Sequence, residues 1–203
     1  MKLKIEKMGI NGEGIGKLDH KIVFVKGALK DEIVDVRIIE EHKNYKIAKL
    51  NKIIKRSKER VDVSCPYYEK CGACQIMQMN YEAQLAYKKA HLLETLNKYF
   101  SVDPKIVSDV IRNDEPLYYR NSLKLPVKMV DGKLISGLYQ SDSNHFLPVK
   151  DCLIHAKNLE KVKKNVLNVL NKYHVPAYER KNKKGLRALF LRELSDKYQL
   201  ALI

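Results

Sequence analysis

Three of the four cysteines, Cys65, Cys71 and Cys74, lie within ten residues of one another, and Cys152 lies far downstream. Thiolates are the preferred ligands of zinc and of iron-sulfur clusters, so this density indicates a soft metal centre. Gly72 would let the backbone pass close to a bulky group, because glycine has no β-carbon and can adopt a positive φ. A four-thiolate site would cross-link the segment after residue 64 to the segment near residue 150.

Other interpretations of these cysteines stay open. Disulfides are disfavoured, because the chain is rich in lysine and residues 1–10 lack the apolar segment of a secretory signal. Buried free thiols that pack as small hydrophobic groups are one alternative. Zinc is the stronger one, although zinc sites usually present two closely spaced cysteine pairs, whereas a spaced triplet with one remote cysteine favours an iron-sulfur cluster. The spacing alone leaves both metals open.

The chain is strongly basic. Its 203 residues include 39 Lys and Arg against 24 Asp and Glu, which gives a formal net charge of +15. Such a charge indicates a polyanionic partner, and nucleic acid is the first candidate. The length and the 45% apolar composition predict a buried core and one or two domains. No apolar run approaches a membrane span, so we expect a cytoplasmic protein without a membrane partner.

Residues 1–61 predict a small five-stranded β-barrel of the oligonucleotide-binding kind, because short runs of alternating or β-branched residues are separated by turns. The predicted strands include Leu3–Ile5, Ile22–Val25, Val34–Ile38 and Tyr45–Ile54. Gly12, Gly14 and Gly16 are predicted to form a flexible turn. Their spacing differs from that of a dinucleotide-binding loop, and no helical pattern follows them.

Residues 62–203 predict an α+β domain with antiparallel strands. A basic segment, Lys52–Arg60, precedes the predicted boundary. A first helix should begin after Asn80 as N-cap and end at Phe100. Its predicted apolar stripe consists of Leu85, Leu92, Leu96 and Tyr99. A second helix is predicted over Leu159–Tyr173. Its predicted buried stripe consists of Leu159, Val162, Val166, Val169, Leu170 and Tyr173, and its other face, which includes Lys161, Lys163 and Lys164, should be exposed and cationic.

Asp131-Gly132 predicts a hairpin turn in which Val130 pairs with Lys133. This register assigns to the core face Leu123, Leu125, Val127, Met129, Leu134 and Leu138. The opposite face receives Arg120, Lys124, Lys128 and Tyr139. That basic face is either solvated or contacts RNA phosphates, and both alternatives stay open. A basic loop tip supplies three further candidate RNA contacts, Lys181, Lys183 and Lys184.

The final segment alternates through Leu189 and Leu191, turns at Ser195–Lys197 and continues as an apolar run over Tyr198–Ile203. Folded domains seldom stop inside such a strand, so we expect this chain to be a fragment of a longer protein.

Several motifs together resemble one family. They are Gly9-Ile10-Asn11-Gly12-Glu13-Gly14-Ile15-Gly16, Cys65-x5-Cys71-Gly72-x-Cys74-Gln75, Tyr119-Arg120-Asn121, Gly137-Leu138-Tyr139 and Asp151-Cys152-Leu153-Ile154-His155. Over essentially its whole length the chain resembles the N-terminal half of bacterial RNA uracil-C5 methyltransferases that act on 23S ribosomal RNA. The resemblance implies a TRAM domain, which is an RNA-binding barrel, followed by a central domain.

The resemblance also implies a 4Fe-4S cluster bound by Cys65, Cys71, Cys74 and Cys152. In the family, a C-terminal Rossmann-like domain binds S-adenosylmethionine, and that domain would be absent here. There a cysteine thiolate adds to C6 of uracil, and a base removes the C5 proton. With all four cysteines assigned to the cluster, no catalytic nucleophile is left. We therefore expect this chain to bind ribosomal RNA without methylating it.

Two alternatives to this function stay open. The first is a self-sufficient zinc-bearing RNA-binding protein, which accounts for the charge and the cysteines but not for the unfinished final strand. The second is a ferredoxin-like electron carrier or a radical enzyme, which the five-residue gap after Cys65 and the presence of Cys152 disfavour. The residues indicate neither which uridine is modified nor an oligomeric state.

Overall fold

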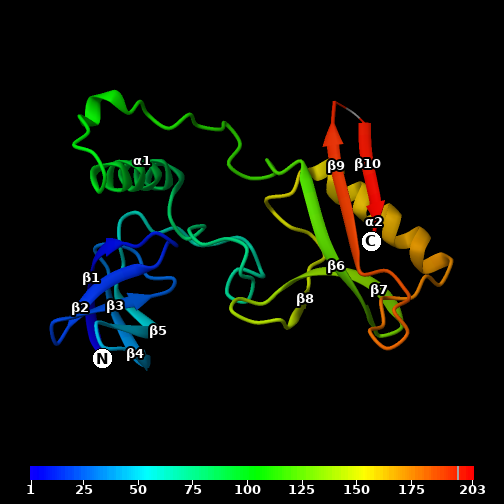
Figure 1. The fold of residues 1–203 in the computed structure, drawn as a ribbon, viewed down its shortest axis with the longest axis horizontal. Coiled ribbons are helices and arrows are strands. Elements are labelled where there is room, and N and C mark those ends of the chain that lie inside the picture. Colours follow the sequence, from blue (N-terminus) through cyan, green and yellow to red (C-terminus); the bar gives the residue numbers. More distant parts are fainter. Residues whose placement is uncertain (196) are drawn as a thin grey trace. The chain divides into compact units, whose positions relative to one another are not determined.

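The computed structural model describes residues 1–195 and 197–203, and contacts between residues divide the chain into two units (Figure 1). Unit 1 comprises Met1–Ser64 and Cys74–Arg112, and unit 2 comprises Cys65–Ala73 and Asn113–Ile203. The segment with the first two cysteines therefore belongs to unit 2, although parts of unit 1 flank it in the sequence. Independent folding of residues 1–61 and 62–203 as domains stays a prediction.

A closed β-barrel forms the first part of unit 1, as the sequence predicts (Figure 1). Its strands are β1 (Lys2–Met8), β2 (Gly14–Leu18), β3 (Lys21–Val25), β4 (Ile33–Glu41) and β5 (Tyr45–Lys55), in the order β1-β2-β3-β5-β4. The pair β3 and β5 is parallel. The inward residues of the alternating pattern form the core: Leu3, Ile5, Val23, Val25, Ala28, Val34, Val36 and Ala48. Closure pairs each of these five strands on both sides.

The predicted flexible turn of three glycines is wrong for two of them. Gly14 and Gly16 lie in β2 rather than in the turn. A β-carbon on Gly16 would overlap the carbonyl oxygen of Lys4 in the neighbouring β1, so this glycine permits close strand approach. Gly12 does lie in the turn, with a φ of 80° that favours glycine.

Helix α1 (Tyr81–Asn97) follows the barrel in unit 1, and a short 3₁₀ helix, η1 (Pro104–Ile106), comes after it. The predicted N-cap is confirmed, because the Asn80 side chain accepts a hydrogen bond from the Ala83 N–H at 2.9 Å. The helix ends three residues before the predicted Phe100.

The predicted apolar stripe of α1 is wrong for two of its four residues, while Leu85 and Leu96 are half-buried. Leu92 is 47% exposed and Tyr99 is 76% exposed. The helix instead packs on the barrel through Ala83 and Tyr87, together with Met8, Leu29 and Met79. The short Ala83 side chain allows close approach, and the Tyr87 hydroxyl donates a hydrogen bond to the Gly9 carbonyl oxygen at 2.6 Å.

Unit 2 contains an antiparallel sheet in the order β10-β9-β6-β7-β8 (Figure 1). Its strands are β6 (Ser122–Val130), β7 (Lys133–Tyr139), β8 (Phe146–Pro148), β9 (Ala188–Leu194) and β10 (Lys197–Leu202). The predicted hairpin at Asp131-Gly132 is confirmed, since Val130 lies opposite Lys133. Both turn residues have positive φ, as a two-residue hairpin turn of this type requires. The turn predicted at Ser195–Lys197 includes Asp196, which lies outside the described residues.

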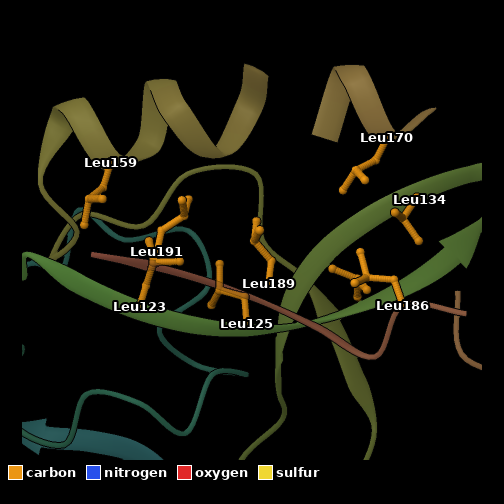
Figure 2. Packing of buried hydrophobic residues seen from close by; sticks show 9 residues of the cluster. Leu123, Leu125, Leu134, Leu159, Leu170, Leu186, Leu189 and Leu191 are labelled. Atoms are coloured by element: carbon orange, nitrogen blue, oxygen red, sulfur yellow. The ribbon is translucent and has the colours of Figure 1, made fainter. Parts of the chain in front are cut away.

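Helix α2 (Lys157–Lys172) covers one face of this sheet (Figure 2). The core between them consists of Leu123, Leu125, Val127, Leu134, Leu159, Leu170, Leu186, Leu189 and Leu191. Three predicted core residues are exposed instead: Met129 beside the hairpin turn, and Val169 and Tyr173 at the end of the helix. Among the described residues, neither helix has the length and apolar character needed to cross a membrane.

Candidate cysteine site and basic surfaces

The segment Cys65–Ala73 is held against the connection between β7 and β8. Cys71 forms a backbone bridge with Gln140, and the Ser141 N–H donates to the Lys70 carbonyl oxygen at 2.9 Å. The Tyr67 hydroxyl accepts a hydrogen bond from the Lys150 N–H at 3.2 Å. These contacts fix the segment beside the residues that lead into Cys152.

The Cys71 thiol lies within electrostatic range of two other cysteines. Burial raises this pKa, the Ala73 N–H opposes the rise, and the nearby charges of Cys152 and Cys65 raise it further. Electrostatic interaction weakens with distance, so Cys65 and Cys152 lie in the surroundings of Cys71 within unit 2. A metal shared by these residues stays a prediction.

The fourth cysteine belongs to the other unit, because the division falls between Ala73 and Cys74. Within the part of the chain that the structure describes, no group of three or more His, Cys, Asp or Glu side chains is arranged as the ligands of a metal ion. Gly72 does not use the positive φ that glycine permits. A glycine is needed there for packing, because a β-carbon would lie 3.1 Å from the Ser141 Cα.

Cys152 lies at one end of a buried network of charged groups. Burial raises the pKa of Cys152, but a hydrogen bond from the His155 side chain, backbone N–H groups and the His155 charge lower it below the ordinary value overall. His155 Nδ1 lies 2.7 Å from the Glu160 Oε1. Glu160 also pairs with the Lys163 ammonium group, which donates to the Lys150 carbonyl oxygen at 2.8 Å. The network connects the Cys152 thiol to helix α2.

The same contacts shift the pKa of His155. Burial lowers this pKa, whereas hydrogen bonds to Cys152 and Glu160 and their negative charges raise it above the ordinary value overall. The three charged side chains are nearly inaccessible, with 3% exposure for His155, 7% for Glu160 and 1% for Lys163. A charged imidazole between a thiolate and a carboxylate is the arrangement that these shifts favour.

The prediction that Lys163 belongs to an exposed cationic face is wrong. Lys163 is buried because Glu160, three residues earlier on the same side of α2, supplies a counter-charge, and the Lys150 carbonyl oxygen supplies a further acceptor. Sequence reasoning also missed His155 and Glu160 as partners of Cys152. The available signal was the spacing Cys152-x2-His155-x4-Glu160-x2-Lys163, in which every member can be charged.

The candidate RNA-binding residues are all exposed and lie in three places in unit 2. Lys124 and Lys128 lie on the face of β6 opposite α2, and Arg120 lies two residues before that strand. Lys181, Lys183 and Lys184 share one turn between α2 and β9, closed by a backbone bridge between Glu179 and Lys184. Their contact with RNA stays a prediction.

Comparison with known proteins identifies sequences and a structure that are similar to this chain. Residues 1–50 match the family model of the TRAM domain. An uncharacterized RNA methyltransferase of Streptococcus mutans is 38% identical over 204 residues, which cover 99% of this chain and 44% of the relative. One from Enterococcus faecalis is 38% identical over 193 residues, which cover 94% of this chain and 42% of the relative. The chain thus spans less than half of the length of these curated relatives.

A solved structure shares the fold. The crystal structure of Pyrococcus abyssi tRNA (uracil-54, C5)-methyltransferase in complex with S-adenosyl-L-homocysteine matches with a TM-score of 0.69 at 20% identity, covering 100% of this chain and 45% of that chain. At this identity the likeness shows a shared fold. The relatives of higher identity show that the chain is homologous to RNA methyltransferases, and its first 50 residues are similar to the TRAM domain.

Proposed function

We propose that this chain is the RNA-recognition part of an S-adenosylmethionine-dependent methyltransferase that forms 5-methyluridine in 23S ribosomal RNA. The main support is the match of nearly the whole chain to RNA methyltransferases more than twice its length, with the TRAM match at its start. The net charge of +15 suits a polyanionic substrate. The fold likeness to a uracil-C5 methyltransferase agrees with this reaction.

In this proposal the chain binds and orients RNA, and S-adenosylmethionine is held by a further domain outside the 203 residues. Uracil-C5 methylation through addition to C6 needs a free thiolate as nucleophile. All four cysteines are assigned to a cluster, so the chain alone is inactive. Incubation with S-adenosylmethionine and ribosomal RNA should give no 5-methyluridine by nucleoside mass spectrometry, and a clear product would contradict the assignment.

The proposed 4Fe-4S cluster is bound by Cys65, Cys71, Cys74 and Cys152. Burial and the nearby charges of Cys152 and Cys65 raise the pKa of Cys71, and a bound cation would favour its thiolate form. A spaced triplet of cysteines with one remote cysteine favours such a cluster over zinc, whose sites usually present two closely spaced cysteine pairs. When bound, the cluster would supply a covalent cross-link between distant segments of the chain.

Metal analysis separates the cluster from zinc. Protein purified without oxygen should be brown and should contain iron and acid-labile sulfide in equal amounts. A Cys152→Ser variant should lose both, whereas Ser143→Ala, a change on the β7–β8 connection that keeps every cysteine, should retain them. Colourless protein with stoichiometric zinc would support the second candidate, a self-sufficient zinc-bearing RNA-binding protein.

RNA binding is tested separately from the metal. The metal-loaded chain should bind 23S ribosomal RNA fragments with an affinity that falls linearly on a plot of log K against log salt. Changing Lys181, Lys183 and Lys184 together to Gln should reduce that slope by about 2, if each contacts one phosphate. Lys172→Gln, on the neighbouring helix, is the matched control. Absence of binding at low salt would contradict the proposed function.

A further inference from the structure

The face of the unit 2 sheet opposite α2 combines basic and aromatic side chains, unlike the leucine-rich core face. Because directly paired residues lie on the same face, the register assigns its members. Lys124 pairs with Phe190, Lys128 with Ile135, and Tyr139 with Phe146. Arg192 lies on this face as well, opposite Ser122. We refer to this surface as the outer face, defined by Lys124, Lys128, Tyr139, Phe146, Phe190 and Arg192.

The aromatic rings of the outer face are accompanied by cations. The Lys128 Nζ lies 5.6 Å from the centroid of the Phe146 ring, and the Arg192 Cζ lies 5.5 Å from that of Phe190. Tyr139 is 47% exposed, and both phenylalanines are partly exposed. Exposed rings beside charged groups are typical of a binding surface.

Gly137 holds one of these rings against the sheet. A β-carbon at this position would lie 2.7 Å from the Phe146 Cζ and would also overlap the Leu147 carbonyl oxygen. The Phe146 ring therefore lies over the backbone of β7 and leans toward Lys128 on β6. A ring held in this way loses little further conformational freedom when a second ring stacks on it.

The charge of the outer face has one sign. Among the described strand residues on this face, none is acidic. Glu193 of β9 belongs to the opposite face, where the Asn158 side chain of α2 donates a hydrogen bond to it at 3.2 Å. An antiparallel sheet that combines exposed rings with cations is complementary to unpaired nucleotides, because bases stack on rings and phosphates pair with Lys and Arg.

We propose that the outer face of the unit 2 sheet is a stacking platform for unpaired RNA bases, with Phe146, Phe190 and Tyr139 as the rings and Lys124, Lys128 and Arg192 as phosphate contacts. The inference rests on the proposed RNA-recognition function and specifies the structure of the substrate: a single-stranded loop or an opened segment. A base-paired duplex hides the faces of its bases and cannot use the rings.

The test compares two RNAs by fluorescence anisotropy with the full metal-loaded chain. The first probe is an unstructured uridine-rich oligonucleotide of about 12 nucleotides, and the second is a fully paired hairpin. Phe146→Leu and Phe190→Leu keep an apolar side chain but remove the ring. Each should weaken binding of the unstructured RNA about tenfold, with an unchanged salt slope, and leave hairpin binding within about twofold.

Two controls support the interpretation. Tyr173→Leu removes an exposed ring that also has a lysine beside it, 5.8 Å away, but that lies at the end of α2. It should bind both RNAs like the unchanged chain. Lys124→Gln should reduce the salt slope by about 0.7 for single-stranded RNA. In the unchanged chain, ultraviolet crosslinks to the unstructured RNA should fall on peptides that contain Phe146 or Phe190.

The outcomes separate the platform from the proposed function. Normal binding of both RNAs by the leucine variants, or equal weakening for both RNAs, would overturn the platform and leave RNA recognition standing. Crosslinks confined to other peptides would overturn it as well. If the unchanged chain binds neither RNA, the proposed function itself fails.

Discussion

Two glutamates are buried among the described residues, Glu32 at 0% exposure in unit 1 and Glu160 at 7% in unit 2, and their carboxylates have different partners. Glu32 pairs with the Arg60 guanidinium through both oxygens and accepts further hydrogen bonds from the N–H groups of Leu29 and Ser57. Glu160 is shared between His155 and Lys163. Glu32 is bound by the planar guanidinium group of Arg60, whereas Glu160 belongs to the network that ends at the Cys152 thiol.

The two glutamates differ in whether their partners can titrate near neutral pH. Arginine keeps its charge at every relevant pH, and Arg60 also donates to the Gly27 carbonyl oxygen, so it joins the segment after β5 to the connection between β3 and β4. Histidine and cysteine can both titrate near neutral pH. The unit 2 network can therefore change its charges near neutral pH, whereas the Arg60 partner of Glu32 stays charged.

The largest loss of stability should follow from removing the Arg60 guanidinium group. Arg60→Ala leaves the fully buried Glu32 without its counter-charge, which should cost about 3 to 5 kcal/mol of the free energy of unfolding. Hydrogen exchange measured by mass spectrometry would resolve the loss by region. Peptides from the barrel should lose protection, and those from the unit 2 sheet should keep it.

An exposed arginine nearby is the matched control. Arg56 pairs with Asp62, and the two side chains are 49% and 93% exposed. Arg56→Ala should therefore cost only about 0 to 1 kcal/mol. Equal losses for the two arginine variants would contradict the importance assigned to burial.

Glu160→Gln should destabilise unit 2 by a smaller amount, about 2 to 3 kcal/mol, because the amide keeps the size of the side chain but weakens hydrogen bonds to charged partners. Urea unfolding measures this loss of stability, and hydrogen exchange in α2 assigns it to unit 2. Glu179→Gln, a change at an exposed carboxylate of unit 2, is the control and should have little effect. A loss confined to unit 1 would contradict the prediction.

The same variant has a pH dependence with a definite sign. Burial raises the pKa of Glu160, but His155 and Lys163 lower it below the ordinary value overall. A carboxyl with a lowered folded pKa contributes stability above its unfolded pKa, and that stability is lost as the pH falls through the folded value. Unit 2 should therefore lose stability on acidification, and Glu160→Gln should reduce that loss.

Local patterns in the sequence were sufficient for most of the sheets. Alternation predicted the barrel strands other than β2, and Asp131-Gly132 gave the hairpin register, because turn chemistry and side-chain period act over a few residues. The apolar stripe predicted for α1 was wrong in part, since the contact of this helix with the barrel depends on Ala83 and the Tyr87 hydroxyl rather than on leucines. The burial of Lys163 also escaped prediction, because a carbonyl oxygen from a distant segment supplies one of its partners.

At the candidate cysteine site, too, the sequence predicts the residues but not the long-range contacts that position them. Cysteine density and family resemblance selected the four residues, but neither gives the contacts that hold Cys65–Ala73 on the β7–β8 connection. Those contacts involve backbone groups, which every sequence has. The role of Gly72 could not be deduced for the same reason, since only the fold brings Ser141 against it.

Tyr87→Phe should have a smaller effect on unit 1 than either buried pair has on its own unit. The change removes one hydroxyl hydrogen bond to Gly9 and should cost about 1 kcal/mol. Hydrogen exchange in α1 should increase, while protection of the barrel stays unchanged. Tyr99→Phe at a 76% exposed position should change neither, and loosening of the whole barrel by Tyr87→Phe would be the contrary result.

The smallest effect concerns reactivity rather than stability. In metal-free protein, the pKa of Cys152 is lowered overall by His155 against the effect of burial, whereas burial raises that of Cys71. Because the thiolate is the nucleophile, iodoacetamide labelling followed by peptide mass spectrometry should give a lower midpoint pH for Cys152 than for Cys71. Glu160→Gln should move the Cys152 midpoint upward, since His155 loses the carboxylate that favours its charged form. Arg56→Ala should move neither midpoint. A higher midpoint pH for Cys152 than for Cys71 would show that the network does not lower the pKa of the Cys152 thiol.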